Sequence, residues 1–98
     1  MDVKEEREPL TDIIDADDSV RVIVELPGVE KNDIKLSGTD DRLTIAVETP
    51  ERKYFKEVEL PAKVDVKKAK SAYKNGVLDI TVPKKKEEKA KTRTIDIE

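Results

Sequence analysis

The sequence predicts an all-β protein, built as a sandwich of two antiparallel sheets. Apolar residues alternate with polar ones in five short runs between Val20 and Val82, and this is the period of a half-buried strand. Turn-forming residues, chiefly Pro and Gly, separate the runs at short intervals, as in other all-β sandwiches. No stretch within residues 10–83 keeps a helical period, so we expect no long helix.

The first predicted strand runs from Val20 to Val24, where valines alternate with Arg21 and Ile23. Leu26-Pro27-Gly28-Val29 ends it, because proline lacks a backbone donor and glycine permits a turn. After the polar connection 30–33, Ile34 and Leu36 share one face of a short second strand.

The remaining predicted strands follow the same two-residue period. Asn75-Gly76 between the last two is a strong hairpin signal, and residues 65–70 have room for one brief turn. The strands are expected at Leu43–Val47, Tyr54–Glu59, Ala69–Tyr73 (the weakest) and Val77–Val82.

The chain divides into three parts by composition. Residues 1–8 form a short charged N-terminal segment, residues 9–83 form the sandwich domain, and residues 84–98 form a flexible C-terminal tail. Within the tail, the stretch 84–91 has no apolar face and is typical of a solvated linker. Apolarity returns at Ile95-Asp96-Ile97.

Ile95 and Ile97 would point to the same side of an extended segment. A flexible tether carrying two such anchors is suited to strand addition on an exposed sheet edge. The pair is equally suited to a last strand of the domain's own sheet. The residues alone do not separate docking within one chain from docking between chains.

The residue inventory argues against an enzyme. The chain of 98 residues has no Cys and no His, so it lacks thiolate chemistry, the usual general base and the commonest metal ligand. Asp15, Asp17 and Asp18 lack the glycine and distal glutamate of an EF-hand loop, and they lead into a strand as a polar turn. We therefore expect no catalytic, metal or cofactor site and no cofactor.

The charge balance and the hydropathy limit the kinds of partner that we expect. The net charge is −3, whereas a nucleic-acid surface usually shows a basic excess. Lys84-Lys85-Lys86 is followed by Glu87-Glu88 and is better interpreted as a linker than as a phosphate site. No apolar run reaches the length of a membrane span, and Met1–Glu6 shows no signal-peptide pattern. We expect a cytoplasmic protein with no nucleic-acid or membrane partner.

Four motifs in order resemble those of the small heat shock proteins, and of their archaeal type with a short N-terminal arm. They are Val24 to Val29 with Asp33-Ile34, Val58 to Pro61 with Val64-Asp65, Asn75 to Leu78 with Val82-Pro83-Lys84, and the I-x-I motif Ile95-Asp96-Ile97. Together they cover residues 10–98. Each motif is weak alone, but four at family spacing are specific.

The resemblance implies an α-crystallin-type, immunoglobulin-like β-sandwich and an ATP-independent holdase of the stress response, which binds unfolding client proteins and prevents their aggregation. It implies self-association into an oligomer, in which Ile95 and Ile97 dock on a neighbouring subunit. The implied groove has Ile34 and Leu36 as one wall and Ala69 and Ser71 as the other.

The sequence departs from the family pattern in three places. Only the short segment 1–8 precedes the domain, where relatives carry a long arm. Pro50-Glu51-Arg52 replaces a long loop whose strand is exchanged in a dimer, so we expect no such exchange. Lys56 stands where the family has arginine, which keeps the charge but loses bidentate geometry. These departures leave a second interpretation open, a β-sandwich adaptor or co-chaperone module without general holdase activity.

Overall fold

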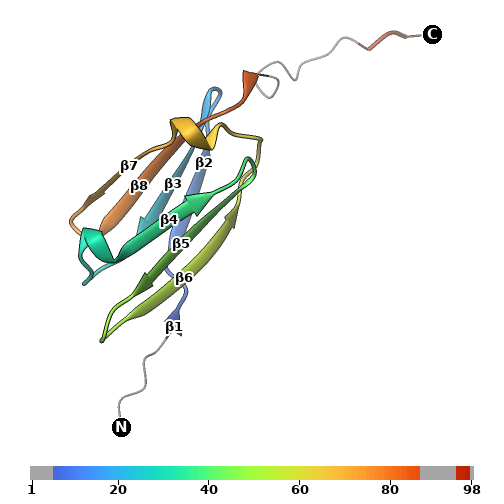
Figure 1. The fold of residues 1–98 in the computed structure, drawn as a ribbon. Coiled ribbons are helices and arrows are strands. Elements are labelled where there is room, and N and C mark those ends of the chain that lie inside the picture. The colour runs from blue at the N-terminus through green and yellow to red at the C-terminus, as the bar shows by residue number, and fades with distance from the viewer. Residues whose placement is uncertain (1–5, 87–94, 98) are drawn as a thin grey trace.

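The computed structural model describes residues 6–86 and 95–97, and it packs two four-stranded sheets face to face (Figure 1). The predicted all-β sandwich is confirmed. Within residues 6–86 the only helices of three residues or more are the 3-10 helices η1 (Lys31–Asp33) and η2 (Val66–Lys68). The strands are β1 (Glu6–Arg7), β2 (Thr11–Asp15), β3 (Ser19–Glu25), β4 (Ile34–Gly38), β5 (Arg42–Glu48), β6 (Lys53–Glu59), β7 (Lys70–Lys74) and β8 (Val77–Pro83).

One sheet has the order β1-β6-β5-β4 and the other has the order β2-β3-β8-β7. In the first sheet β4, β5 and β6 form an antiparallel meander, and β1 joins β6 in parallel. In the second sheet β3 pairs with β8 along its whole length. This pairing joins the two ends of the domain in one sheet.

The alternating residues of the sequence fill the core, as expected. Val20, Val22 and Val24 of β3 are fully buried, and Ile45 of β5 faces them from the other sheet. The buried residues among those described are thirteen core hydrophobic residues and Pro9, and none is polar or charged. Burial of this apolar surface is the main favourable contribution to folding, and it leaves the charged residues outside.

The hairpin between β7 and β8 turns at Asn75-Gly76, as predicted. Both residues have positive φ, 52° at Asn75 and 79° at Gly76. Two consecutive left-handed residues are the requirement of a type I′ turn, which asparagine and glycine meet best. The turn sets the register that places Tyr73 opposite Leu78.

The sequence analysis missed two strands. β2 contains the neighbours Ile13 and Ile14, which must point to opposite faces, so its apolar residues do not alternate. It forms because its whole length pairs with β3. β1 lies inside the charged segment 1–8, and Glu6 and Arg7 pair there with Lys53 and Tyr54 of β6.

Candidate binding grooves

The two edge strands β4 and β7 belong to different sheets and border one side of the sandwich. A groove of about 140 Å³ lies between them. Its floor includes Leu78 of β8, which is 4% exposed. An edge where two sheets part is open to a further segment, because within residues 6–86 neither strand has a neighbour on that side.

One wall of this β4–β7 groove comes from β4. Ile34 pairs with Val47 and Leu36 pairs with Ile45, and both partners are core residues. Directly opposed residues share a face of the sheet, so Ile34 and Leu36 point between the sheets. Both side chains are half-buried, which leaves apolar surface in the groove.

The other wall comes from β7, where Ser71 and Tyr73 point between the sheets opposite Ile80 and Leu78. The structure thus brings Ser71 together with Ile34 and Leu36. Ala69 is not among the residues that line the groove. It follows η2, donates its backbone N–H to the Val66 carbonyl, and packs against the core.

Tyr73 was missed by the sequence analysis and is the most strongly held residue of the groove. Its hydroxyl oxygen lies 2.6 Å from the Leu26 carbonyl and 3.0 Å from the Val29 carbonyl. These contacts tie β7 to the loop between β3 and β4. The turn sequence around Pro27-Gly28 is therefore connected to the groove wall. An aromatic residue two positions after Ser71, on the same face, was the available signal.

Ile95 and Ile97 do not line this groove. Their exposed fractions are 84% and 97%, so neither anchor is covered in the single chain. The groove itself is bordered by cations. Lys31 lines it, and Lys70 and Lys74 are exposed on β7.

A second groove, of about 490 Å³, lies on the opposite side of the sandwich between β2 and β6. Within residues 6–86, β2 pairs only with β3, and β1 covers only the first two residues of β6. Ile13 points between the sheets opposite Val22, yet 46% of it is exposed. Leu10 beside it is 72% exposed. The β2–β6 groove is therefore an uncovered extension of the core.

Charged side chains form the rim of the β2–β6 groove. Lys56 forms an ion pair with Glu8, which crosses from β6 to the segment before β2. Glu57 and Glu59 complete the rim. The groove was missed because Pro9-Leu10 and Ile13-Ile14 do not follow a single period. Two adjacent isoleucines near a predicted edge were the available signal.

The connection between β5 and β6 is a tight turn. Glu48 pairs with Lys53, and the Thr49 N–H donates to the Arg52 carbonyl at 2.8 Å. The Thr49 hydroxyl accepts from the Arg52 N–H at 2.9 Å. All of these contacts lie within one hairpin. That this chain exchanges no strand with a partner remains a prediction.

Within residues 6–86 and 95–97, no three acidic or other ligating side chains are grouped to hold a metal ion. No helix in the described part of the chain has the length and apolarity to cross a membrane.

Comparison with known proteins gives consistent matches. The sequence profile of the Hsp20/alpha crystallin family matches residues 12–98. Small heat shock protein C2 of Rickettsia felis is 31% identical over 105 residues, which cover 91% of this chain and 67% of that protein. Heat shock protein 16 of Schizosaccharomyces pombe is 32% identical over 97 residues, covering 81% of this chain and 68% of that protein.

Solved structures share the fold. Heat shock protein 16.0 from Schizosaccharomyces pombe superposes with a TM-score of 0.74 at 28% identity, covering 95% of this chain and 77% of that one. The Del-C4 mutant of hsp14.1 from Sulfolobus superposes with a TM-score of 0.70 at 26% identity, covering 80% of this chain and 76% of that one.

Proposed function

Because this chain belongs to the Hsp20/alpha crystallin family, we propose that it is a small heat shock chaperone, which holds unfolding proteins by binding and without catalysis. The observation that carries the proposal is the pair of open sandwich edges, where inward-facing apolar side chains remain exposed. Unfolding proteins expose apolar segments, and covering apolar surface contributes about 25 cal/mol per Å² without any nucleotide. Cytoplasmic action remains a prediction.

We assign client contact to the β2–β6 groove. Leu10 and Ile13 offer apolar side chains there, and the outer edge of β2 offers backbone donors and acceptors. An extended client segment can add to such an edge as a strand, with alternate side chains in the groove. The charged rim keeps the edge from pairing indiscriminately.

The client assay has a matched pair of variants on adjacent residues. Ile13 and Ile14 are exposed to 46% and 44%, but Ile13 points into the groove and Ile14 points to the outer face opposite Arg21. We expect the full chain to slow client aggregation without ATP. Ile13→Ser should weaken this several-fold and Ile14→Ser should leave it nearly unchanged. Equal effects of the two changes would contradict the assignment.

We assign tail docking to the β4–β7 groove. Ile95 and Ile97 are two residues apart, and so are Ile34 and Leu36 on one wall and Ser71 and Tyr73 on the other. An extended segment therefore matches the groove in spacing. Burial of two isoleucines contributes about 3–6 kcal/mol, and ordering of the tail offsets much of it.

Charge favours the same pairing. The tail motif carries Asp96 and Glu98, and Lys31, Lys70 and Lys74 are exposed at or beside the groove. These are surface charges, so salt should weaken them. Docking on a neighbour should therefore depend on both protein concentration and ionic strength.

Light scattering over a concentration series tests docking between chains. The double change Ile95→Ala with Ile97→Ala should reduce the mass of any oligomer and leave the far-UV spectrum unchanged. Thr94→Ala with Asp96→Glu is the control, since these residues would point away from the groove and the charge of the motif is kept. An unchanged mass in the isoleucine variant would refute docking between chains.

A second function, an adaptor for one partner, is favoured by the small number of exposed large hydrophobic residues. Within the described part of the domain they are Leu10, Ile13, Ile14 and Phe55. An aggregation assay with several unrelated client proteins distinguishes the two functions. A holdase should slow the aggregation of all of them, whereas an adaptor should slow none of them.

A further inference from the structure

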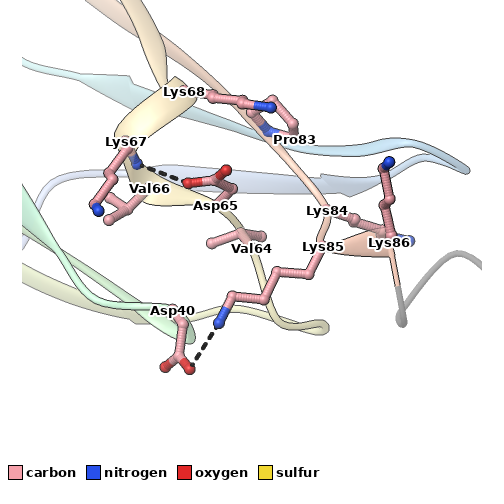
Figure 2. Close-up of a pocket in the computed structure, with 10 residues that line it drawn as sticks. All are labelled: Asp40, Val64, Asp65, Val66, Lys67, Lys68, Pro83, Lys84, Lys85 and Lys86. Atoms are coloured by element: carbon pink, nitrogen blue, oxygen red, sulfur yellow. Dashed lines mark hydrogen bonds and ion pairs between the residues drawn. The ribbon is translucent and has the colours of Figure 1, made fainter.

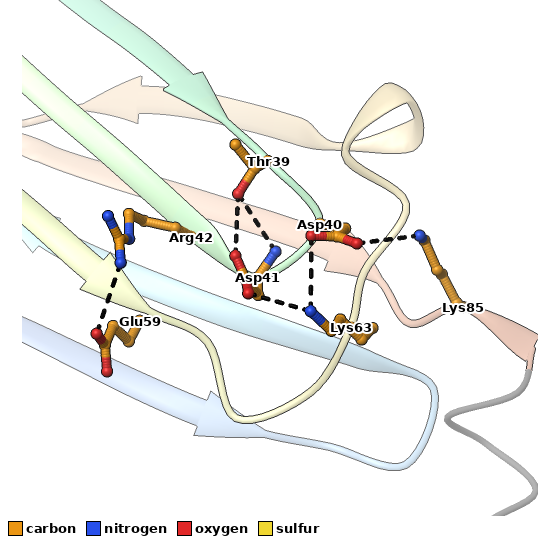
Figure 3. Close-up of polar contacts among 7 residues, drawn as sticks. All are labelled: Thr39, Asp40, Asp41, Arg42, Glu59, Lys63 and Lys85. Carbon is orange, nitrogen blue, oxygen red and sulfur yellow. Dashed lines mark hydrogen bonds and ion pairs between the residues drawn. The ribbon is translucent and has the colours of Figure 1, made fainter.

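Six lysines gather at the end of the sandwich where β8 finishes. Five of them line one cavity there (Figure 2), and the sixth, Lys63, lies beside Asp40 and Asp41 (Figure 3). The six lysines come from two segments, the β6–β7 connection and the chain after β8. Backbone contacts hold these segments side by side. Val64 pairs with Lys84, the Asp65 N–H donates to the Pro83 carbonyl at 2.9 Å, and the Lys85 N–H donates to the Lys63 carbonyl at 3.0 Å. The lysines are Lys63, Lys67, Lys68, Lys84, Lys85 and Lys86.

Three of these lysines are neutralised by aspartates (Figure 3 shows two). Lys85 lies 3.4 Å from Asp40, and Lys63 lies 3.1 Å from Asp41. The hydrogen bond from Lys63 holds the pKa of Asp41 below its ordinary range, so Asp41 stays ionised. Lys84 lies 2.6 Å from Asp15, and its side chain is only 12% exposed.

The other three lysines, Lys67, Lys68 and Lys86, make no ion pair with any residue of 6–86 or 95–97. The nearby Asp65 carboxylate accepts the backbone N–H of Lys67, where it caps η2. The three border a cavity of about 650 Å³ together with Val64, Val66 and Pro83. Asp40 and Asp65 also line the cavity, so five lysines face two aspartates, and the lining combines apolar residues with an excess of positive charge.

We propose that this lysine pocket, defined by Lys67, Lys68 and Lys86, binds a chain of phosphates, with inorganic polyphosphate as its ligand class. Lysine binds phosphate as a point charge, and several lysines around one hollow suit a ligand whose charges are repeated along a chain. The paired backbone segments fix Lys67 and Lys68 relative to Pro83-Lys84. The site is separate from both apolar grooves.

The aromatic residues argue against single-stranded nucleic acid as the ligand. Proteins that bind single strands stack bases on aromatic side chains. The chain has three aromatic residues, and none lines the lysine pocket. Tyr54 and Tyr73 bond to carbonyls of the loop between β3 and β4. A ligand without bases needs no such platform.

Calorimetric titration of the full chain with short-chain polyphosphate tests the proposal. The triple change Lys67→Gln, Lys68→Gln and Lys86→Gln should weaken binding at least about tenfold. It should also reduce the salt dependence of log K by about 2, at roughly 0.7 for each phosphate that a lysine no longer neutralises. Lys35→Gln, Arg52→Gln and Lys53→Gln remove the same charge elsewhere, away from the lysine pocket and both grooves, and should have little effect.

Every outcome of the titration bears on the site. Equal weakening in the two triple variants would mean that net charge alone determines binding, and it would refute binding in the lysine pocket. An absence of saturable binding by the unchanged protein would overturn it as well. A single-stranded oligonucleotide that binds as tightly as polyphosphate, through the same lysines, would replace the proposed ligand with nucleic acid. Client holding and tail docking do not enter these measurements, so they stand or fall separately.

Discussion

The two open edges of the sandwich differ in how completely the sheets cover them. At the β4–β7 edge, Tyr73 spans to the β3–β4 loop, and the groove is about 140 Å³. At the β2–β6 edge no such residue among those described spans the sheets, the groove is about 490 Å³, and an ion pair crosses it. An inward-facing residue is therefore buried only where the opposite sheet reaches it. Ile13 shows this, because it points inward and is 46% exposed.

The largest effect should come from removing the residue that closes the first edge. Tyr73→Ala should lower the free energy of unfolding by about 3 kcal/mol, because it removes a half-buried aromatic ring together with its hydrogen bonds. Tyr73→Phe retains the ring and should cost about 1 kcal/mol. Urea unfolding measures both. Equal destabilisation by the two changes would mean that the hydroxyl alone joins β7 to the loop.

A matched truncation compares the two edges directly. Leu36→Ala should cost about 2 kcal/mol, since its side chain packs against the core at the β4–β7 edge. Ile13→Ala should cost about 1 kcal/mol, because nearly half of that side chain already contacts water. The measurement is the urea midpoint at constant m-value. A larger destabilisation by the Ile13 change would reverse the comparison.

The strands whose apolar residues alternate strictly were predictable from sequence, whereas the edge strands β1 and β2 were not. β3 lies between β2 and β8 in the interior of its sheet, and one of its faces covers the core. Its core-facing residues Val20, Val22 and Val24 are therefore apolar at every second position. Asn75-Gly76 was predictable because positive φ restricts the choice of residue. β2 escaped prediction because an edge strand exposes both faces in part, so its apolar residues need not alternate.

The groove walls show a similar division. Ile34, Leu36 and Ser71 line one groove because β4 and β7 are the edge strands on the same side of the sandwich. Ala69 lies outside the lining because it is the C-cap of η2, which ends at Lys68, and β7 begins one residue later, at Lys70. Tyr73 could not be assigned a role from sequence, since its partners are backbone carbonyls more than forty residues away.

A smaller effect should come from the ion pair across the second edge. Lys56 and Glu8 are 28% and 68% exposed in their side chains. Pairs of this kind contribute about 0.5 kcal/mol. A double-mutant cycle with Lys56→Gln and Glu8→Gln should give that coupling at low salt and less at high salt. A coupling that persists unchanged in high salt would mean that the pair is shielded from solvent.

The smallest effect should lie away from both edges, at Arg21 and Asp79 on the outer face of the β3–β8 sheet. The guanidinium donates to both carboxylate oxygens, at 3.0 and 2.5 Å, and these hydrogen bonds hold the pKa of Asp79 below its ordinary range. The unfolded state therefore binds a proton more readily than the folded state. This stabilisation should be complete at neutral pH and disappear as pH falls through the lowered pKa.

Asp79→Asn isolates that contribution. The variant should be slightly less stable than the unchanged protein at pH 7, and the difference should shrink in acid. Urea midpoints of both proteins across the acid range measure it. A difference that is independent of pH would assign the effect to packing and not to the charge of Asp79.

The strand order also has a kinetic consequence. β4, β5 and β6 form two consecutive hairpins, so each of these pairings closes a short loop. β3 pairs with β8 across a long stretch of sequence that contains all three strands, and the hydrogen-bonded residues Arg21 and Asp79 are 58 residues apart. Loop-closure entropy makes such distant pairings the slow step of folding. The meander should therefore exist transiently with its inner face bare. During synthesis that face stays uncovered until β8 leaves the ribosome, after the other strands of residues 6–86. Before β8 pairs, the chain is therefore incompletely folded and exposes an apolar sheet face.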